Sequence, residues 1–345
     1  QQAQARLDEI LDANTADRGI VTDGYLAGAT VWADQDGDGV QDPDEPTTTT
    51  DAGGDFAFTD PDGQAIDVGG VLFARGGTDI TTDLTFQGTL SAPEGSSTIS
   101  PLTSLVTRVQ QQTGSSSEDA EAQVKQALGL DADVDLTTVD PIATLGDAGA
   151  SDAARADALQ VQAASTQVVS LVSLAGSAAG GATGNDDVGS SNGQAFGAIA
   201  DAISRTSGDE TVDLSDPDTV ATIVRDTLAR AQQATGQSLA DDQVDTVVSN
   251  VGELSRNANQ RVRDALEQGD DPADVFQQIT RAQKVAQGEA ASSVRLGAQN
   301  NNFDESNARF GGDNFDDRVD ETDVNLPGGV ADPGPDQPDG GTGDD

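Results

Sequence analysis

The spacing of apolar residues changes along the chain and divides it into parts. In the opening stretch AQARLDEILDA, apolar residues recur at helical spacing, which predicts a short helix within residues 1–18. From there to about Ser100 the apolar runs are short, alternate with polar residues and are separated by turn signals such as DAGGD and DPDG. These runs predict a small antiparallel β-sandwich over residues 19–100.

A helical period begins at Pro101 and dominates residues 101–297. Three of the later helices have marked starts, because Ser215, Ser238 and Asp271 each precede a periodic run and are followed three residues later by an acid. The segment ADALQVQAASTQVVSLVSLAGSAAG is the most apolar, and we expect it at the centre of an Ala-rich helical bundle. The stretch GGATGNDDVGSSNG after it is typical of a flexible loop.

The last part of the chain, residues 298–345, loses this periodicity and fills with Asn, Asp, Gly and Pro. That composition predicts an extended, disordered acidic tail. Phe303, Phe310 and Phe315 stand out in it, because the whole chain has only nine Phe, and we expect them to dock on a neighbouring molecule. The predicted fold class is therefore α+β: an N-terminal β-sandwich, a helical bundle and an extended tail.

The composition indicates a lean core and a strongly acidic surface. Of 345 residues, 35% are hydrophobic and only 3% aromatic, while 61 acidic residues face 17 basic ones for a net charge of −44. Such a charge argues against binding to nucleic acid or anionic membranes, both of which need clustered Lys and Arg. It fits calcium, a saline environment or a cationic partner, and composition alone does not choose among them.

The chain has no Cys, Met or His and begins at Gln1. We interpret it as a mature secreted chain or a fragment of a longer one, and expect an extracellular or cell-surface location. No uninterrupted apolar run approaches the roughly 18 residues that span a bilayer, so we expect no membrane insertion. Without His or Cys the commonest general base and the thiol nucleophile are missing. A glycosidase with paired carboxylates stays open, but the scarcity of aromatic residues favours a protein that is not an enzyme.

One acidic stretch, ADQDGDGVQDPDEP, matches a twelve-residue calcium loop. Such loops supply oxygens from positions one, three, five, seven, nine and twelve, with Gly at position six to permit a sharp turn. Here Gly39 is sixth, and position seven contributes a backbone carbonyl. The predicted metal ligands are Asp34, Asp36, Asp38, Val40, Asp42 and Glu45.

The flanks of this loop differ from those of a helix–loop–helix calcium site. ATVWA before it predicts a strand, while Pro43 and Pro46 disfavour a helix after it. The sequence therefore predicts a Ca²⁺ loop within the β-region, and an empty solvated turn is the alternative. Extracellular calcium modules bind with dissociation constants of about 10⁻⁴ to 10⁻³ M.

Other candidate sites are weaker. The acids of DADVD at residues 131–135 lack a following Gly and favour a solvated turn or a helix cap. Asp60 and Asp62 favour a turn, with a second ion as the alternative. Trp32 and Tyr25 are expected in the core of the β-region rather than on a sugar-binding surface, because glycan binding uses exposed aromatic faces.

The stretch TDGYLAGATVWADQDGDGVQDPDEPTTTTDAGGDFAF, followed by GGTDITTDLTFQGTLSAPEGSSTISPLTSLV, resembles the calcium-binding, prealbumin-like B-type (CnaB-like) domains of large secreted bacterial adhesins and surface proteins. The resemblance covers roughly residues 22–130. It implies that the acidic loop joins two strands and binds calcium. Some members of that family carry a Lys–Asn isopeptide bond, but Lys125 and Lys284, the only lysines, lie outside the β-region. Calcium would then take a larger share of the stabilisation.

Two functions follow from these expectations. The first is a secreted calcium-binding structural protein that assembles with copies of itself, through its terminal segments, into a filament, sheath, surface layer or biofilm matrix. The second is a monomeric adhesin module that binds a cell-surface or glycan receptor.

Overall fold

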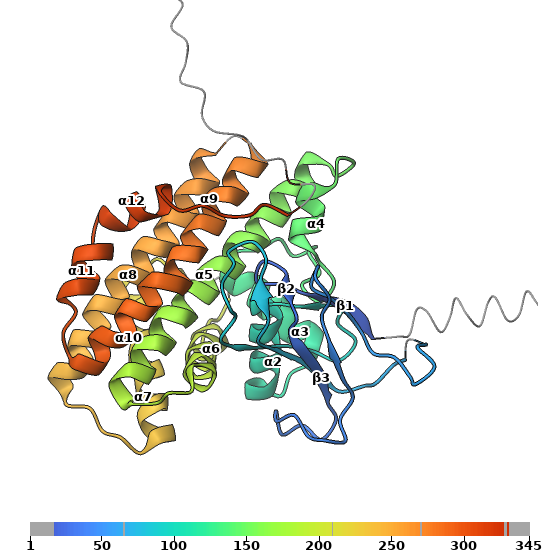
Figure 1. Ribbon diagram of the computed structural model, residues 1–345, viewed down its shortest axis with the longest axis horizontal. Coiled ribbons are helices and arrows are strands. Elements are labelled where there is room, and N and C mark those ends of the chain that lie inside the picture. Colours follow the sequence, from blue (N-terminus) through green and yellow to red (C-terminus); the bar gives the residue numbers. More distant parts are fainter. Residues whose placement is uncertain (1–16, 65, 209, 270, 328–329, 331–345) are drawn as a thin grey trace, which may run out of the picture.

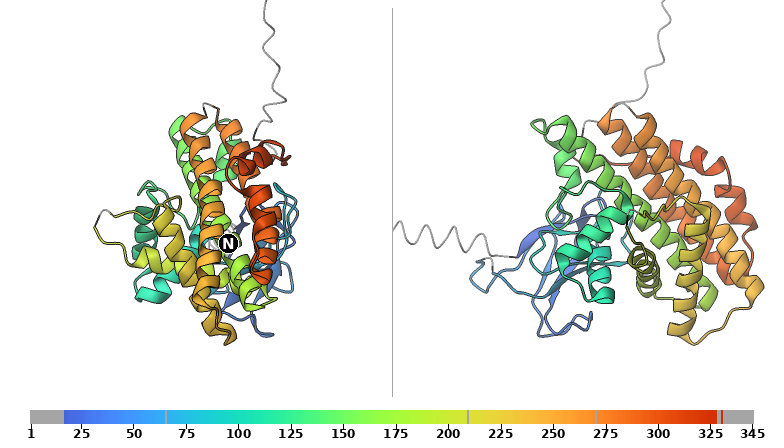
Figure 2. Two further views of the ribbon diagram at one scale, coloured as in Figure 1. Left: turned by 90° about the vertical axis from the view of Figure 1, so that its left-hand side faces the viewer. Right: turned by 180° about the vertical axis from the view of Figure 1, so that it is seen from behind.

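The computed structural model describes residues 17–64, 66–208, 210–269, 271–327 and 330 (Figure 1). A region of short strands comes first and helices follow, so the α+β class is confirmed. The strands gather on one side of the helices (Figure 2). The helix predicted in the first residues and the last part of the predicted tail lie outside the described residues.

The β-region forms three small sheets, with strand orders β5-β1-β9, β2-β7 and β4-β3-β6-β8. One pair departs from the predicted antiparallel arrangement, because β1 and β9 run parallel. Gly19 makes this pairing possible, since a Cβ atom there would lie 1.9 Å from the Ser97 carbonyl oxygen. The strands are β1 (Arg18–Val21), β2 (Leu26–Ala27), β3 (Thr30–Asp34), β4 (Thr47–Thr49), β5 (Asp55–Ala57), β6 (Val71–Arg75), β7 (Thr78–Asp79), β8 (Thr89–Ala92) and β9 (Thr98–Ile99).

The helices begin immediately after β9, where Ser100 caps the first of them by accepting a hydrogen bond from the backbone N–H of Thr103. They are α2 (Pro101–Thr113), α3 (Ser117–Leu128), α4 (Pro141–Gly146), α5 (Asp152–Thr183), α6 (Val188–Ser204), α7 (Pro217–Thr235), α8 (Asp241–Gln268), α9 (Pro272–Val285), the π-helical segment η1 (Ala286–Ala290), α10 (Ala291–Asn300), α11 (Asp304–Phe310) and α12 (Asn314–Asp320).

The helix starts expected from the sequence are shifted in two of three cases. Asp271 caps α9, as predicted. The cap of α7 is Asp216, one residue after Ser215, because its carboxylate reaches the N–H of Thr219. Helix α8 begins at Asp241 with Ala240 as its cap residue, two residues after the predicted cap Ser238.

Helix α5 lies at the centre of the helices and packs against most of them (Figure 1). By length and composition it is apolar enough to cross a membrane, but 83% of its most apolar window is buried inside the protein. The glycines after it do not form the predicted long flexible loop, because α5 continues through Gly180 and Gly181. A Cβ on Gly181 would lie 2.2 Å from the Arg295 carbonyl oxygen, so glycine lets α10 approach α5 closely.

The predicted extended tail is wrong for residues 304–320, which form α11 and α12. The expected docking of Phe303, Phe310 and Phe315 on a neighbouring molecule is also wrong. These side chains are buried within this chain, with exposed fractions of 4%, 0% and 0%. Helix α12 packs on α9 and α8, and α11 on α10. Three aromatic side chains bury enough apolar surface to order an otherwise polar segment, which overrides its composition.

After α12 the chain returns to the β-region. The backbone N–H of Asn325 donates a hydrogen bond to the Thr81 carbonyl (2.8 Å), and its side-chain amide donates to Asp83 Oδ2 (2.8 Å). Lys284 Nζ donates to the carbonyl of Asp323 (2.9 Å). This returning segment therefore crosses from the helices to the turn after β7.

The tail helices should be part of the cooperative fold. Phe310→Ala or Phe315→Ala is expected to lower the free energy of unfolding by about 3–5 kcal/mol, because each ring is fully buried. Denaturant unfolding followed by circular dichroism measures the change. Leu296→Ala is the control, since this side chain is 57% exposed and should shift stability by less than about 0.5 kcal/mol. Wild-type stability in both Phe variants would contradict the packing of α11 and α12.

Candidate metal centre

The acidic loop connects β3 to β4 at one end of the four-stranded sheet. Asp34 is the last residue of β3 and pairs with Val71 of β6. The loop closes where the N–H of Ala33 donates to the Pro46 carbonyl (3.1 Å), just before β4 begins at Thr47. Two strands of a sheet therefore fix both ends of the loop.

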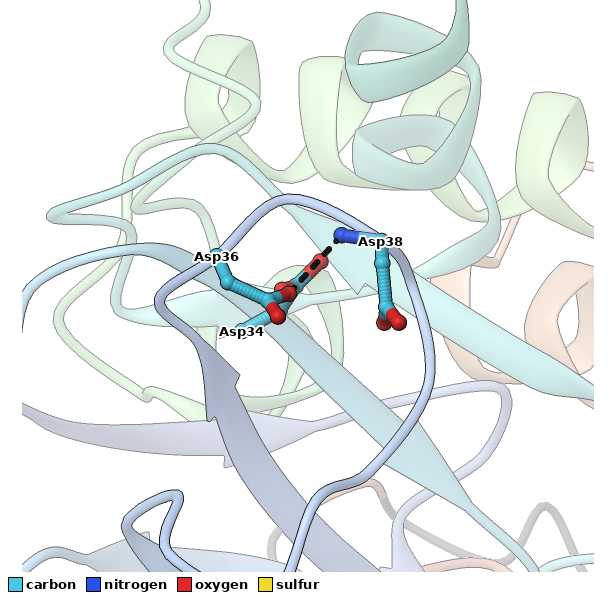
Figure 3. A group of neighbouring side chains, drawn as sticks. All are labelled: Asp34, Asp36 and Asp38. Carbon is cyan, nitrogen blue, oxygen red and sulfur yellow. Dashed lines mark hydrogen bonds between the residues drawn. The ribbon is translucent and has the colours of Figure 1, made fainter.

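Three of the predicted ligands come together in this loop (Figure 3). One carboxylate oxygen from each of Asp34, Asp36 and Asp38 lies within 4.8 Å of the other two. The Asp34 side chain is buried at 4% exposure, whereas those of Asp36 and Asp38 are exposed. The group therefore has a fixed inner member and two members that face solvent.

Backbone N–H groups orient these carboxylates. Asp34 accepts hydrogen bonds from the N–H of Gly37 (2.7 Å, Oδ1) and of Gly39 (2.9 Å, Oδ2). Asp36 Oδ1 accepts from the N–H of Asp38 (3.1 Å). Both glycines have positive φ angles, +82° and +75°, which residues with a side chain rarely adopt. The two glycines therefore let the loop wrap around the Asp34 carboxylate.

The carboxylates of Asp42 and Glu45 are not members of this group of three. Glu45 bridges the loop, because its carboxylate accepts from the N–H of Gln35 (3.0 Å) and of Asp42 (3.0 Å). The side chain of Val40, whose carbonyl was the predicted ligand, is 59% exposed. Partial desolvation, followed by the negative charges of Asp38 and Asp36, raises the pKa of the Asp42 carboxyl. The structure brings together Asp34, Asp36 and Asp38, and the full set of six ligands stays a prediction.

The donor set suits a hard divalent cation. Carboxylate oxygens are the ligands that Ca²⁺ prefers. Within the described ranges, no Lys or Arg forms an ion pair with any acid of this loop. The negative charge is therefore left to solvent ions, and a cation held by the three carboxylates would relieve their repulsion.

The only Trp of the chain lies close to the loop. Trp32 stacks on Phe73 with a centroid distance of 5.2 Å, and the Arg75 guanidinium lies 5.7 Å from the Trp32 ring centroid. The Phe73 ring also borders the loop, 3.9 Å from where a Cβ on Gly39 would stand. Trp32 is only 2% exposed, which confirms its expected place in the core. Its fluorescence should report changes in the loop.

The weaker acidic candidates form turns. Asp60 Oδ1 accepts from the N–H groups of Asp62 and Gln64 (both 2.9 Å). Asp131 Oδ1 accepts from the N–H of Asp133 (2.8 Å). In each case the carboxylate is engaged by its own backbone, which agrees with the interpretation as a turn.

Two features had no clear signal in the sequence. Asp23 and Asp79 are almost fully buried together against α9, although nothing in their spacing indicates a pair. An open groove of about 990 Å³ lies where the turn after β7 faces η1, α10 and α11. Its lining includes the partly exposed side chains of Leu84 and Leu296. Both features arise from contacts between segments more than 200 residues apart.

Comparisons of the chain with protein-family models, with curated proteins and with solved structures found no match. The resemblance of residues 22–130 to prealbumin-like B-type domains therefore stays a prediction. The case for a metal centre depends on the geometry of the loop.

Calcium should bind through the three grouped carboxylates. Asp36→Asn is expected to weaken calcium binding by at least about tenfold, because it removes one charged ligand while its amide oxygen can still accept the hydrogen bond from Asp38. Isothermal titration calorimetry and Trp32 fluorescence measure the affinity. Asp62→Asn, in the turn beginning at Asp60, is the matched control and should bind as the wild type does. Equal affinities in all three proteins would exclude this group as the site.

Asp42 should destabilise the loop when calcium is absent. The raised pKa of the Asp42 carboxyl means that its ionisation is less favourable in the folded state than in the unfolded state. The stability associated with the protonated carboxyl is therefore lost as the pH rises above the ordinary Asp range. Asp42→Asn is therefore expected to raise the melting temperature in EDTA at neutral pH. Differential scanning calorimetry measures this shift, and a lower melting temperature in the variant would show that the charge is favourable there.

Proposed function

We propose that the protein is a secreted calcium-binding structural protein, and that calcium orders its β-region outside the cell. The observation that carries the proposal is the grouping of Asp34, Asp36 and Asp38 within 4.8 Å of one another, with no Lys or Arg paired to them in the described part of the chain. We further propose that the three-stranded and four-stranded sheets act as the two layers of a β-sandwich.

The magnitude of the calcium effect fits a stabilising role. At a free calcium concentration ten times the dissociation constant, binding to the folded state alone contributes about 1.4 kcal/mol. That is a useful fraction of the stability of an ordinary domain, about 5–15 kcal/mol. The loop joins β3 to β4, so the effect would act directly on the four-stranded sheet.

Assembly with further copies is the second part of the proposal. Its support is the strong net charge of −44, which calcium or high salt would screen, together with terminal segments at residues 1–16 and 331–345. Residues 303–320 are used within the chain's own core and are not available for a neighbour. A truncation that tests assembly should therefore begin at residue 331, since cutting at 298 would remove buried Phe side chains.

The adhesin module remains the second candidate, and the open groove beside α10 and α11 favours it. A groove of about 990 Å³ is large enough for a receptor-borne ligand. In that case the calcium loop would stabilise the module without linking one copy to the next.

Electron microscopy with and without a chelator tests the proposal. The full chain is expected to form ordered polymers with calcium and to lose them in EDTA, and deletion of residues 331–345 or 1–16 should reduce assembly. The Asp36→Asn variant should need more calcium to assemble. A calcium-stabilised monomer under all conditions would overturn the assembly proposal and favour the adhesin.

A further inference from the structure

The β-region meets the helices through a buried polar contact that is separate from the calcium loop. Asp23, in the turn after β1, is 3% exposed, and Asp79, at the end of β7, is 1% exposed. Both face Gln283, a fully buried residue near the end of α9. Two carboxylates are thus buried together at the boundary between the strands and the helices.

Glutamine amides from the helices hold this pair. Gln283 Nε2 donates to the backbone carbonyl of Asp23, and also lies 3.2 Å from Asp23 Oδ1 and 3.4 Å from Asp79 Oδ2. Gln287 Nε2 donates to Asp23 Oδ2 (3.1 Å). Thr166 of α5 in turn fixes the Gln283 amide by donating to its Oε1 (3.1 Å). The contact therefore ties the β-region to both α9 and α5.

The π-helical segment η1 contributes to this geometry. Gln283 lies in the last turn of α9 and Gln287 lies inside η1, four residues later, so that both amides reach the same aspartate. Single π-turns within α-helices occur frequently at functional positions. Here the irregular turn coincides with the only part of the helix that binds the buried acids in the described contacts.

The two carboxylates have different surroundings. Asp79 accepts hydrogen bonds within its own turn, from the N–H and Oγ1 of Thr81 (2.8 and 2.7 Å) and from Thr82 Oγ1 (2.8 Å). Three donors of this kind favour an ionised carboxylate. In the described contacts the Asp23 carboxyl receives only the glutamine amides. Thr166 fixes the orientation of Gln283, but Gln287 can turn its amide oxygen toward a protonated Asp23 as readily as its nitrogen toward an ionised one.

The charged groups on the neighbouring elements are engaged elsewhere. Lys284 donates to the Asp323 carbonyl, Glu289 pairs with Arg309 and Arg318, and Asp83 accepts from Asn325. Among the described ion pairs, none includes Asp23 or Asp79.

Two adjacent buried carboxylates without a cation are costly when both are ionised. Burial, followed by the charge of Asp79, raises the pKa of Asp23 well above its ordinary range. Burial also raises the pKa of Asp79, but the hydrogen bonds from Thr81 and Thr82 oppose this.

We propose that the Asp23–Asp79 pair binds one proton, carried by Asp23, and that this proton latches the β-region onto α9 and η1. When the proton is lost, the second buried charge weakens the docking of the turns at residues 22–25 and 79–83. None of the residues in this contact belongs to the calcium loop, so the latch operates independently of that loop.

The sign of the pH effect follows from proton linkage. Because the folded state keeps the proton at pH values where an unfolded aspartate has lost it, the stability from this group is present at low pH and is lost as the pH rises toward the raised pKa. The unfolding equilibrium constant of the wild type should therefore rise, relative to an Asp23→Asn variant, by up to about tenfold per pH unit above roughly pH 4.

The test is denaturant unfolding of the full chain between about pH 4 and pH 8, with calcium and ionic strength held constant. Asp23→Asn should lose this pH dependence and should be at least as stable as the wild type at neutral pH. Asp79→Asn should be less stable than the wild type, because an amide nitrogen in place of Oδ2 would face the donors Thr82 Oγ1 and Gln283 Nε2. Asp83→Asn, an exposed acid on the same turn, is the control and should keep the wild-type pH dependence.

Two results would overturn the proposal. The first is a pair of parallel pH profiles for the wild type and Asp23→Asn. The second concerns the infrared spectrum at neutral pH, where the proposal expects the wild type, but not Asp23→Asn, to show the carbonyl band of a protonated carboxylic acid. A wild-type spectrum without that band would contradict it. Hydrogen exchange locates the effect, since the amides of residues 22–25 and 79–83 should exchange faster as the pH rises, after correction for the intrinsic rate, in the wild type but not in Asp23→Asn.

Discussion

The fold depends on the hydrogen bonds that backbone N–H groups donate to carboxylates. With 61 acidic and 17 basic residues, ion pairs cannot accommodate most of the negative charge. Aspartates instead sit where free N–H groups are concentrated, at helix starts and in tight turns. Asp140, Asp187, Asp216 and Asp271 cap helices in this way. The calcium loop is the densest case of the same arrangement, since Asp34 alone accepts two N–H groups.

A second constraint is the shortage of large apolar side chains. The helices compensate for this shortage by packing closely against one another. Asn192 of α6 lies so near α5 that a Cβ on Gly176 would stand 2.2 Å from its side-chain oxygen. Gly181 allows α10 the same proximity. Small residues thus let the helices approach one another closely, and the few Phe side chains, such as Phe276 and Phe315, are fully buried.

Features encoded locally were predictable from the sequence, and features that depend on distant contacts were not. The group of Asp34, Asp36 and Asp38 follows from alternation within five residues, and the long apolar period of α5 needs no partner to be recognised. Glu45 was placed among the ligands by loop position alone, and nothing in the sequence indicated that its carboxylate would accept hydrogen bonds from the N–H groups of Gln35 and Asp42. The path of a loop decides such contacts, and spacing does not specify it.

The tail illustrates the same limit, because its order comes from surfaces on α8, α9 and α10 that are formed by other parts of the chain. Its polar composition contained no sign of them. The parallel pairing of β1 with β9 likewise depends on a close approach at Gly19 that joins segments some 80 residues apart. Tertiary contacts of this kind override local propensity.

The return of the chain to the β-region after α12 has a mechanical consequence. Asn325 is bonded to the turn after β7 through Thr81 and Asp83. Tension applied at the C-terminal end would therefore load that turn before it reached the long helices. In any arrangement where one molecule is pulled by this end, the boundary between strands and helices would bear the strain and act as the yielding element.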